Sequence, residues 1–303
     1  MPLLFREVIE EVHKNVPQTV MDEFLIHLNG EYNKKKLNLW GKEKSRSFIK
    51  KCLYIGFYHD IKSIGYSKLA SSTSSWLKLP GPTIDHNLKQ IRKALHDHVL
   101  SKMQYGSASE WDRRANRVEK SNELEDVNLW CDSTDFPLKG SRKASTKDLM
   151  WSYKLNKLGL RFLAVFDAKG EVRFISPGYS PKIYDGHWLD MNRPLLEEKF
   201  KGATVIADTH FEKGESMFNN LSFKTPIREP RGKKRRSDGV EVPQLNQGSE
   251  SYNRSHKRLR SRVELPFARM EQIFSIVSEP FYDGEDQLEY LIMIGCGIIN
   301  RMN

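Results

Sequence analysis

Two short, largely apolar segments in the second half of the chain each lead directly into an aspartate. Val127–Cys131 precedes Asp132, and Thr204–Ala207 precedes Asp208. Short apolar runs are typical of buried strands. If the two strands are adjacent and parallel, both carboxylates emerge at one edge of the sheet, where open α/β sheets place their ligands. The alternative interpretation is that each aspartate only caps the turn after its strand.

The sequence between and after these segments predicts a mixed sheet with helices on its faces. Leu160–Phe166 and Glu171–Ile175 are strand-like and are joined by a turn at Asp167–Gly170, which indicates a hairpin. Trp188–Phe200 has helical spacing, as does the segment from Gln287 to about Asn300. The order of strand, strand, strand, helix, strand and then helices favours an α/β fold.

The chain divides by composition into three parts. Residues 1–104 have mostly helical patterns, residues 105–125 are polar and indicate a linker, and residues 126–303 contain the predicted sheet. Residues 222–256 within the last part are rich in Pro, Gly, Ser and charge, and we expect a basic loop there. Hydrophobic residues make up 38% of the 303-residue chain, which is enough for a sizeable core.

Several protein classes do not fit this chain. The longest apolar run, Leu288–Ile299, is shorter than the roughly 20 residues that a membrane span needs, and we expect a core helix there. The N-terminus has early acids and no apolar signal region. The three cysteines are far apart and make neither a disulfide framework nor a CxxC metal site, which favours a reducing compartment.

The N-terminal region contains a pattern with two interpretations. Residues 66–71 suggest a short helix, and Thr83–Val99 suggests a second helix whose polar face carries the basic residues Lys89, Arg92 and Lys93. This arrangement resembles a helix-turn-helix, whose second helix enters the major groove of DNA. An ordinary amphipathic helix with a hydrated basic face fits the same pattern.

The positive charge of the chain is concentrated in one segment. The formal net charge is +10, and Lys224–Arg262 holds twelve basic residues against four acids. Such a concentration is what a polyanion partner requires, because each neutralised phosphate releases counterions. A solvated loop is the alternative, and Lys233–Arg236 also resembles a nuclear import signal. The residues of this segment that we expect to contact DNA are Lys233, Lys234, Arg235, Arg236, Lys257, Arg258, Arg260 and Arg262.

A third acid, Glu264, lies directly behind this basic run. On a helix, Arg260 is one turn before Glu264 and on the same side. Such an acid is either part of a surface salt bridge or a metal-binding group inside a phosphodiester site. Pro266 removes a helix hydrogen bond, so we expect the helix to kink or to begin later.

Together these segments resemble, in order, the catalytic blocks of Harbinger-type DDE transposases over about residues 126–301. Asp132 is followed by a small residue and Thr134 as in the first block, and Asp208 and Glu264 match the second and third blocks. The matching segments are Cys131–Asp135, Trp151–Arg161, Ser176–Trp188, Ile206–Phe211 and Tyr252–Phe274.

The resemblance implies a ribonuclease-H-like fold with Asp132, Asp208 and Glu264 as an acidic triad that binds two Mg²⁺ or Mn²⁺ ions. Asp132 would bridge the two ions, while Asp208 and Glu264 would each hold one. The implied activity is in-line hydrolysis and transesterification of DNA phosphodiesters. The implied partners are double-stranded DNA of the transposon ends and target, a separate DNA-binding accessory protein, and a second copy of the chain. The implied location is the nucleus in a eukaryotic host, or otherwise the cytoplasm with its nucleoid DNA.

Further residues near these blocks are candidates for supporting the site. Asp135, Asp185, His187 and His210 could position the active-site loop, a water or a phosphate; alternatively Asp135 ends a strand, Asp185 and His187 cap a helix, and His210 is exposed. Three departures from the family pattern are Ser133 for the usual Gly, Pro266 two residues after Glu264, and Glu271 for the typical Lys. Pro266 and Glu271 in particular favour an alternative. In that alternative the chain is a domesticated, catalytically weak or inactive DNA-binding protein that kept the fold.

Overall fold

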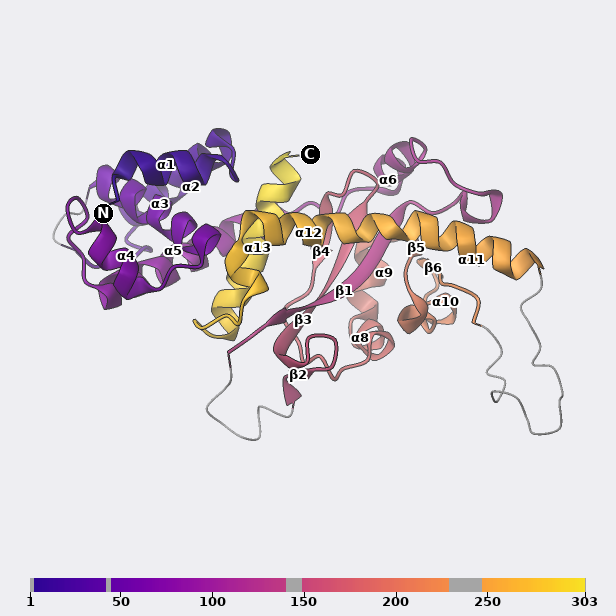
Figure 1. The fold of residues 1–303 in the computed structure, drawn as a ribbon. Helices are drawn as coiled ribbons and strands as arrows, with labels where there is room; N and C mark the ends of the chain where they lie inside the picture. The colour runs from indigo at the N-terminus through magenta and orange to yellow at the C-terminus, as the bar shows by residue number, and fades with distance from the viewer. Residues whose placement is uncertain (1–2, 42–44, 140–148, 229–246, 303) are drawn as a thin grey trace.

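The computed structural model describes residues 3–41, 45–139, 149–228 and 247–302. Figure 1 shows a group of N-terminal helices beside a sheet, with a long helical rod running along the sheet. No helix of the described residues is long and apolar enough to cross a membrane. The N-terminal helices are α1 (Phe5–His13), α2 (Gln18–Asn33), α3 (Arg46–Lys62), α4 (Tyr66–Thr73) and α5 (Gly81–Lys102).

The sheet is mixed, as the sequence predicts. Its strands lie in the order β2-β3-β1-β5-β6, with β4 also paired to β3. β3 runs antiparallel to β1 and β4, whereas β1, β5 and β6 are parallel. The hairpin of β3 and β4 is confirmed. The loop predicted over 222–256 is wrong at both ends, because residues 222–224 form β6 and residues 247–256 belong to a helix. The strands are β1 (Leu129–Pro137), β2 (Trp151–Ser152), β3 (Lys157–Asp167), β4 (Val172–Ile175), β5 (Thr204–Ile206) and β6 (Ser222–Lys224).

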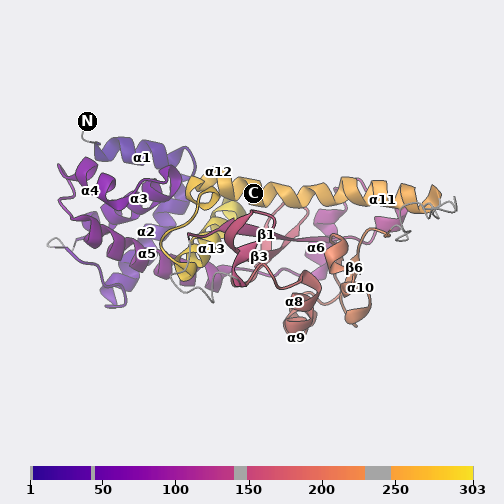
Figure 2. The same ribbon diagram turned by 60° about the horizontal axis from the view of Figure 1, so that its bottom comes forward.

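Helices cover both faces of the sheet (Figure 2). Alternate residues of β1 and β3 point to opposite faces. Leu129 and Cys131 pack in one cluster with Trp188 of α8 (Asp185–Met191) and Leu196 of α9 (Arg193–Lys199). Trp130, Phe162 and Phe166 pack in the other cluster, with residues of the C-terminal helices. The helix predicted over 188–200 is therefore present as two short helices.

The long rod consists of α11 (Gln247–Arg260), a 3₁₀ turn η3 (Ser261–Val263) and α12 (Glu264–Ile273). The break falls where Pro266 predicted it. Pro266 lies in the first turn of α12, where its missing N–H costs no helical hydrogen bond. The break therefore fixes Glu264 at the start of α12, one turn beyond Arg260 at the end of α11.

The last helix, α13 (Glu285–Met302), lies between the N-terminal helices and the sheet and contacts both. It packs on α5, on α12 and on β4. Its residues Leu288 and Ile292 share one apolar cluster with the N-terminal helices and with one face of the sheet. The N-terminal helices and the sheet are therefore held together by a continuous core.

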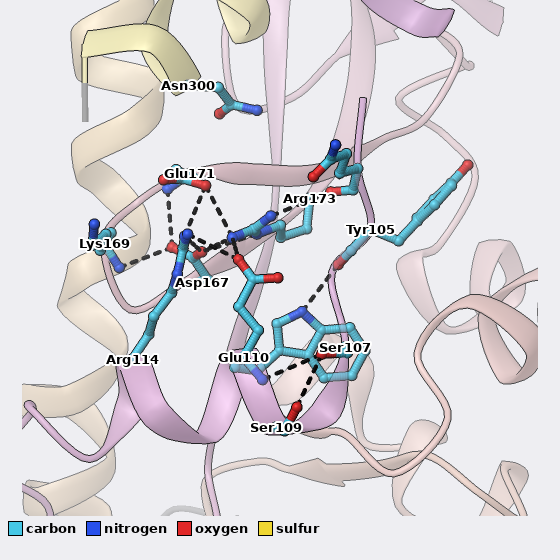
Figure 3. Close-up of polar contacts among 12 residues, drawn as sticks. Tyr105, Ser107, Ser109, Glu110, Arg114, Asp167, Lys169, Glu171, Arg173 and Asn300 are labelled. Carbon is cyan, nitrogen blue, oxygen red and sulfur yellow. Dashed lines mark hydrogen bonds and ion pairs between the residues drawn. The ribbon is translucent and has the colours of Figure 1, made fainter. Parts of the chain in front are cut away.

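The segment 105–125 is not the linker that its polar composition indicated. It forms α6 (Ala108–Ala115), whose Trp111 is buried. Arg173 Nη2 on β4 lies 2.6 Å from Asp167 Oδ2 and 2.7 Å from Glu110 Oε1, and Arg114 of α6 pairs with Asp167 and Glu171 (Figure 3). Two polar residues of α6, Glu110 and Arg114, thus pair with the β3–β4 hairpin.

Arg92 of helix α5 is buried and is not available to contact DNA. Arg92 is 3% exposed, and its guanidinium pairs with Asp60 and, at 2.6 Å, with Asp283. Asn87 is buried and bonds to the backbone of Trp40. The helix packs against α2, α3, α4 and α13. The structure therefore contradicts the expectation that Arg92 contacts DNA, because tertiary packing uses the face that the sequence pattern left open.

Lys89 and Lys93 keep their charged ends at the surface of α5. Lys89 Nζ lies 2.8 Å from Asp85, and Lys93 Nζ lies 3.4 Å from Asp97. Both pairs join residues four apart on one helix, an arrangement that stabilises exposed helices by a few tenths of a kcal/mol. Their role in DNA binding stays a prediction.

We expect Arg92→Ala to lower the free energy of unfolding by about 3–5 kcal/mol, because the buried Asp60 carboxylate would lose its cation. Lys93→Ala, the neighbouring exposed residue, should change it by less than about 0.5 kcal/mol. Urea denaturation followed by circular dichroism measures both values. Equal stability of the two variants would contradict the structural role assigned to Arg92.

Candidate active site

The parallel pairing of β1 with β5 brings Asp132 and Asp208 to the same level of the sheet. Trp130 pairs with Ile206, and each aspartate lies two residues further along its own segment. The prediction that both aspartates follow the ends of their strands is correct only for Asp208. Asp132 lies inside β1 and pairs with Ala164 of β3, because β1 continues along β3 after its pairing with β5 has ended.

Both carboxylates have one oxygen bound to the backbone. Asp132 Oδ1 accepts a hydrogen bond from the Ser133 N–H at 2.8 Å, and Asp208 Oδ1 accepts one from the His210 N–H at 2.8 Å. Asp208 thereby caps the 3₁₀ turn η2 (Thr209–Phe211). Asp208 therefore caps the turn, as one interpretation of the sequence predicted, but it uses only Oδ1 to do so. The Oδ2 atom of each aspartate is left for another partner.

The second oxygens meet at Arg260. Its Nη2 lies 3.0 Å from Asp132 Oδ2 and 3.9 Å from Asp208 Oδ2. Arg260 reaches this position because Trp130, on the same face of β1 as Asp132, donates its indole N–H to the Leu259 carbonyl at 3.0 Å. One nitrogen thus contacts both carboxylates, so the two groups face a shared space at the edge of the sheet.

Burial raises the pKa of Asp132 to about 6. Arg260 opposes this rise, whereas the negative charge of Asp208 adds to it. Raised carboxylate pKa values are typical of sites that bind cations or transfer protons, although structural ion pairs also shift pKa values.

A further carboxylate, Asp185, lies at the same edge. It is buried at the first turn of α8 and accepts a hydrogen bond from the Tyr179 hydroxyl at 3.2 Å. Burial raises its pKa, Arg161 and the Ser133 hydroxyl lower it, and the charge of Asp208 raises it. The structure therefore places Asp185 within the electrostatic field of the two aligned aspartates.

Asp135 supports this arrangement from inside the sheet. It does not end the strand, since β1 extends to Pro137. It pairs across the strands with Arg161, whose Nε lies 2.6 Å from Asp135 Oδ1 and whose Nη1 lies 3.6 Å from Asp185 Oδ1. Arg161 therefore connects the two acids.

Sequence reasoning missed Arg161 and Tyr179. The available signal for Arg161 was a single charged residue inside the apolar run Leu160–Phe166, because such a charge needs a buried partner. Tyr179 had no comparable signal, since its hydroxyl is directed by the loop that follows β4.

The remaining predicted residues are distributed differently. Glu264 begins α12, and its side chain lies outside the described part of the structure. His187 and His210 are exposed, and the His210 ring lies edge-on to Tyr184 with 6.0 Å between centroids. Among the described side chains, no group of three or more His, Cys, Asp or Glu is arranged to hold a metal ion.

The basic residues of the rod lie mostly at the surface. Lys257, Arg258 and Arg262 are exposed, and Arg258 pairs with Glu119 at 2.8 Å. Arg260 is the exception, since it turns inward to the acids. The run Lys233–Arg236 lies outside the described residues.

A mixed sheet that places two aspartates side by side, with a basic helix above them, is an arrangement suited to a phosphodiester-cleaving enzyme. A family model described as DDE superfamily endonuclease matches residues 131–300, which is more than half of the chain. The chain belongs to this family. No curated protein and no solved structure matches the chain significantly.

We expect Asp132→Asn to stabilise the metal-free protein at pH 7. Because the folded-state pKa of Asp132 is raised from 3.8 to about 6, its contribution to stability is fully present below pH 4 and is lost as the pH rises through 6. The amide avoids this loss, which is worth up to about 3 kcal/mol. Thermal unfolding of both proteins between pH 4 and pH 8 measures the effect. If the difference in stability between the two proteins does not become smaller toward pH 4, the prediction is wrong.

Proposed function

We propose that this chain is a metal-dependent DNA endonuclease and strand transferase of the DDE transposase type, similar to the Harbinger-type transposases. The observation that carries the proposal is the contact of Asp132 and Asp208 with one cationic nitrogen, at a sheet edge inside the family match. Asp132, Asp208 and Glu264 form the proposed acidic triad.

The sheet supports a ribonuclease-H-like fold for this triad. An antiparallel half, β4-β3-β1, is continued by the parallel strands β5 and β6. The first acid lies on the central strand, the second follows the neighbouring parallel strand, and the third begins a helix of the rod that crosses the sheet. The three acids of the proposed triad therefore come from three different elements, two at the sheet and one in the rod.

The residues present fit divalent metal ions of the Mg²⁺ or Mn²⁺ type. Carboxylate oxygens are the ligands that these ions prefer. The buried carboxylate of Asp132, whose pKa is raised, gains most from a nearby cation. Asp132, Asp208 and Glu264 would hold two ions, which supply a water activated at neutral pH and stabilise the leaving oxygen.

The residues around the triad have positioning roles in this proposal. The Ser133 N–H and the His210 N–H each orient one carboxylate through its Oδ1 atom. Arg161, held by Asp135, fixes Asp185 beside them. Cleavage would free a 3′-hydroxyl of the transposon end, and this hydroxyl would attack target DNA at the same site.

The second candidate is a domesticated, inactive protein. Of two departures from the family pattern, Glu271 supports this candidate and Ser133 does not. Glu271 is an exposed acid on the rod, where it would repel DNA. Ser133, the other departure from the family pattern, is compatible with the site, because its N–H binds Asp132 and its hydroxyl binds Asp185. The geometry around Asp132 therefore favours an active enzyme.

We expect Asp132→Asn and Asp208→Asn to abolish Mg²⁺- or Mn²⁺-dependent nicking of duplex DNA while DNA binding is retained. Each substitution removes a metal-binding charge without changing the shape of the side chain. Asp190→Asn, an exposed acid on α8, is the matched control and should nick at the wild-type rate. Gel assays of supercoiled plasmid and fluorescence anisotropy of labelled duplex give both readouts. Nicking at the wild-type rate by purified Asp132→Asn would refute the assignment.

We also propose that the exposed basic face of α11 and the turn after it bind the DNA backbone. Its opposite face is buried through His256 and Leu259, so the outer residues have a fixed orientation. In Figure 1 this helix extends away from the N-terminal helices. The exposed basic residues of this face are Arg254, Lys257, Arg258 and Arg262.

We expect the triple variant Lys257→Gln, Arg258→Gln and Arg262→Gln to flatten the salt dependence of DNA binding. On duplex DNA each lost phosphate contact reduces the slope of log K against log salt by about 0.9. A triple variant of exposed lysines on the N-terminal helices, Lys14→Gln, Lys34→Gln and Lys68→Gln, removes the same charge and should leave the slope unchanged. Identical slopes for the two variants would place the DNA elsewhere.

A further inference from the structure

Arg260 holds its acids less completely than the two most buried arginines that pair with acids, Arg92 and Arg173, hold theirs. Arg92 and Arg173 are at most 5% exposed in their side chains and each engages several carboxylate groups through more than one nitrogen. Arg260 is 27% exposed and approaches Asp132 and Asp208 through Nη2 alone. Its Nε is buried without a hydrogen-bond partner among the described residues.

This guanidinium is therefore held weakly compared with the structural arginines. The buried Nε leaves one donor unsatisfied, which costs free energy of about 1–3 kcal/mol in the observed arrangement. A shift that gives Nε a partner would recover that cost. Arg260 is the last residue of α11, where the rod changes from α-helix to 3₁₀ turn. Part of its side chain is exposed to solvent.

Arg260 and a divalent ion would use the same oxygen atoms. Asp132 and Asp208 both have Oδ1 bound to the backbone, so Oδ2 is the atom that each offers to a cation. Arg260 Nη2 lies 3.0 Å from one Oδ2 and 3.9 Å from the other. A cation bound between these two oxygens needs the space that Nη2 takes, and the like charges repel each other.

DNA offers the displaced guanidinium a second partner. Arginine binds phosphate oxygens in two-donor geometry, which would engage the donor that is unsatisfied in the observed arrangement. Arg260 also lies on the same rod as the exposed basic residues Lys257 and Arg258, which in our proposal contact the backbone. A phosphate at the site would thus draw Arg260 away from the carboxylates while the metal ions bind there.

We propose that Arg260 is a built-in counter-cation that competes with the divalent ions for Asp132 and Asp208 and transfers to a DNA phosphate, so that metal and DNA bind cooperatively. This inference rests on the proposed nuclease function. Because the coupling between two ligands is reciprocal, DNA increases the affinity for metal by the same factor by which metal increases the affinity for DNA.

The test is a Mn²⁺ titration of the full chain without DNA at neutral pH, with free Mn²⁺ measured by electron paramagnetic resonance. Arg260→Gln should bind Mn²⁺ about tenfold more tightly than the wild type, a value within the usual range of such couplings. Arg258→Gln removes the same charge from an exposed position two residues away and is the matched control. It should bind Mn²⁺ within about twofold of the wild type. Asp132→Asn should lose the site.

The outcomes separate this inference from the proposed function. If the wild type binds Mn²⁺ at a site that Asp132→Asn removes, and Arg260→Gln binds it no more tightly, the competition is overturned and the nuclease proposal stands. If no Mn²⁺ binding depends on Asp132 in either protein, both proposals fail. Equal tightening by Arg258→Gln would reduce the effect to general charge and would overturn the specific role of Arg260.

A second measurement needs no folded Arg260 variant. The wild type is titrated with Mn²⁺ in the presence of a short duplex, and the same titration of Asp132→Asn subtracts the ions that the DNA itself holds. We expect the remaining site to bind Mn²⁺ more tightly with DNA than without it. Unchanged affinity would overturn the cooperative uptake. The folded variant Arg260→Gln should show no increase in Mn²⁺ affinity when DNA is added. If Arg260→Gln does not fold, Arg260→Met, which keeps the long apolar stem of the side chain, is used in its place.

Discussion

The site depends on a very short parallel pairing between β1 and β5. Only Leu129 with Val205 and Trp130 with Ile206 are paired, yet this register sets Asp132 and Asp208 at one level. A shift by one residue would turn one of the two carboxylates to the other face of the sheet. The register is held by two hydrogen bonds between Asn128 and Thr204. The side-chain oxygen of Asn128 accepts one from the backbone N–H of Thr204, and the backbone N–H of Asn128 donates the other to the Thr204 carbonyl. The buried residues on both faces of β1 add to this specification, because a slip would expose them.

The acids at this edge tolerate burial because arginines from two different elements approach them. Arg161 comes from β3, inside the sheet, and is fixed by Asp135. Arg260 comes from the rod and is less constrained. The first arginine organises the site permanently, since removing it would leave two buried carboxylates unpaired. In our proposal the second arginine is exchanged for a metal ion, while the first keeps the shape of the site unchanged.

The sequence was sufficient for the parts of the fold that have a strong local pattern. The β3–β4 hairpin, the break at Pro266 and the last helix follow from periodicity and turn residues, and the mixed sheet follows from their order. The interpretation of 105–125 as a linker failed because its charged residues bond to Asp167 and Arg173, far away in sequence. Arg92 was misassigned for the same reason. A charge pattern on one helix does not reveal an acid such as Asp283 on another segment.

The sequence drew attention to Asp132 and Asp208 through strand patterns and the resemblance, and in the structure both contact Arg260. The partners of their charges could be found only from the tertiary structure. Arg260 illustrates the limit: its spacing from Glu264 could be read from the sequence, but its contact with Asp132 and Asp208 could not, and Arg258 and Arg262 in the same basic run are exposed. What separates them is helical phase. Leu259 is buried against the sheet and accepts a hydrogen bond from Trp130, so the next residue falls above Asp132.

The rod connects this site to the rest of the molecule. Its outer half carries exposed basic residues, its break lies at the acids, and its inner half, α12, packs on α13. α13 in turn packs on α5 within the N-terminal helices. Arg260 and Glu264 lie on either side of the break. Through the packing of α5 on α13 and of α13 on α12, the N-terminal helices are therefore connected to the half of the rod that begins with Glu264, which is the third acid in our proposal.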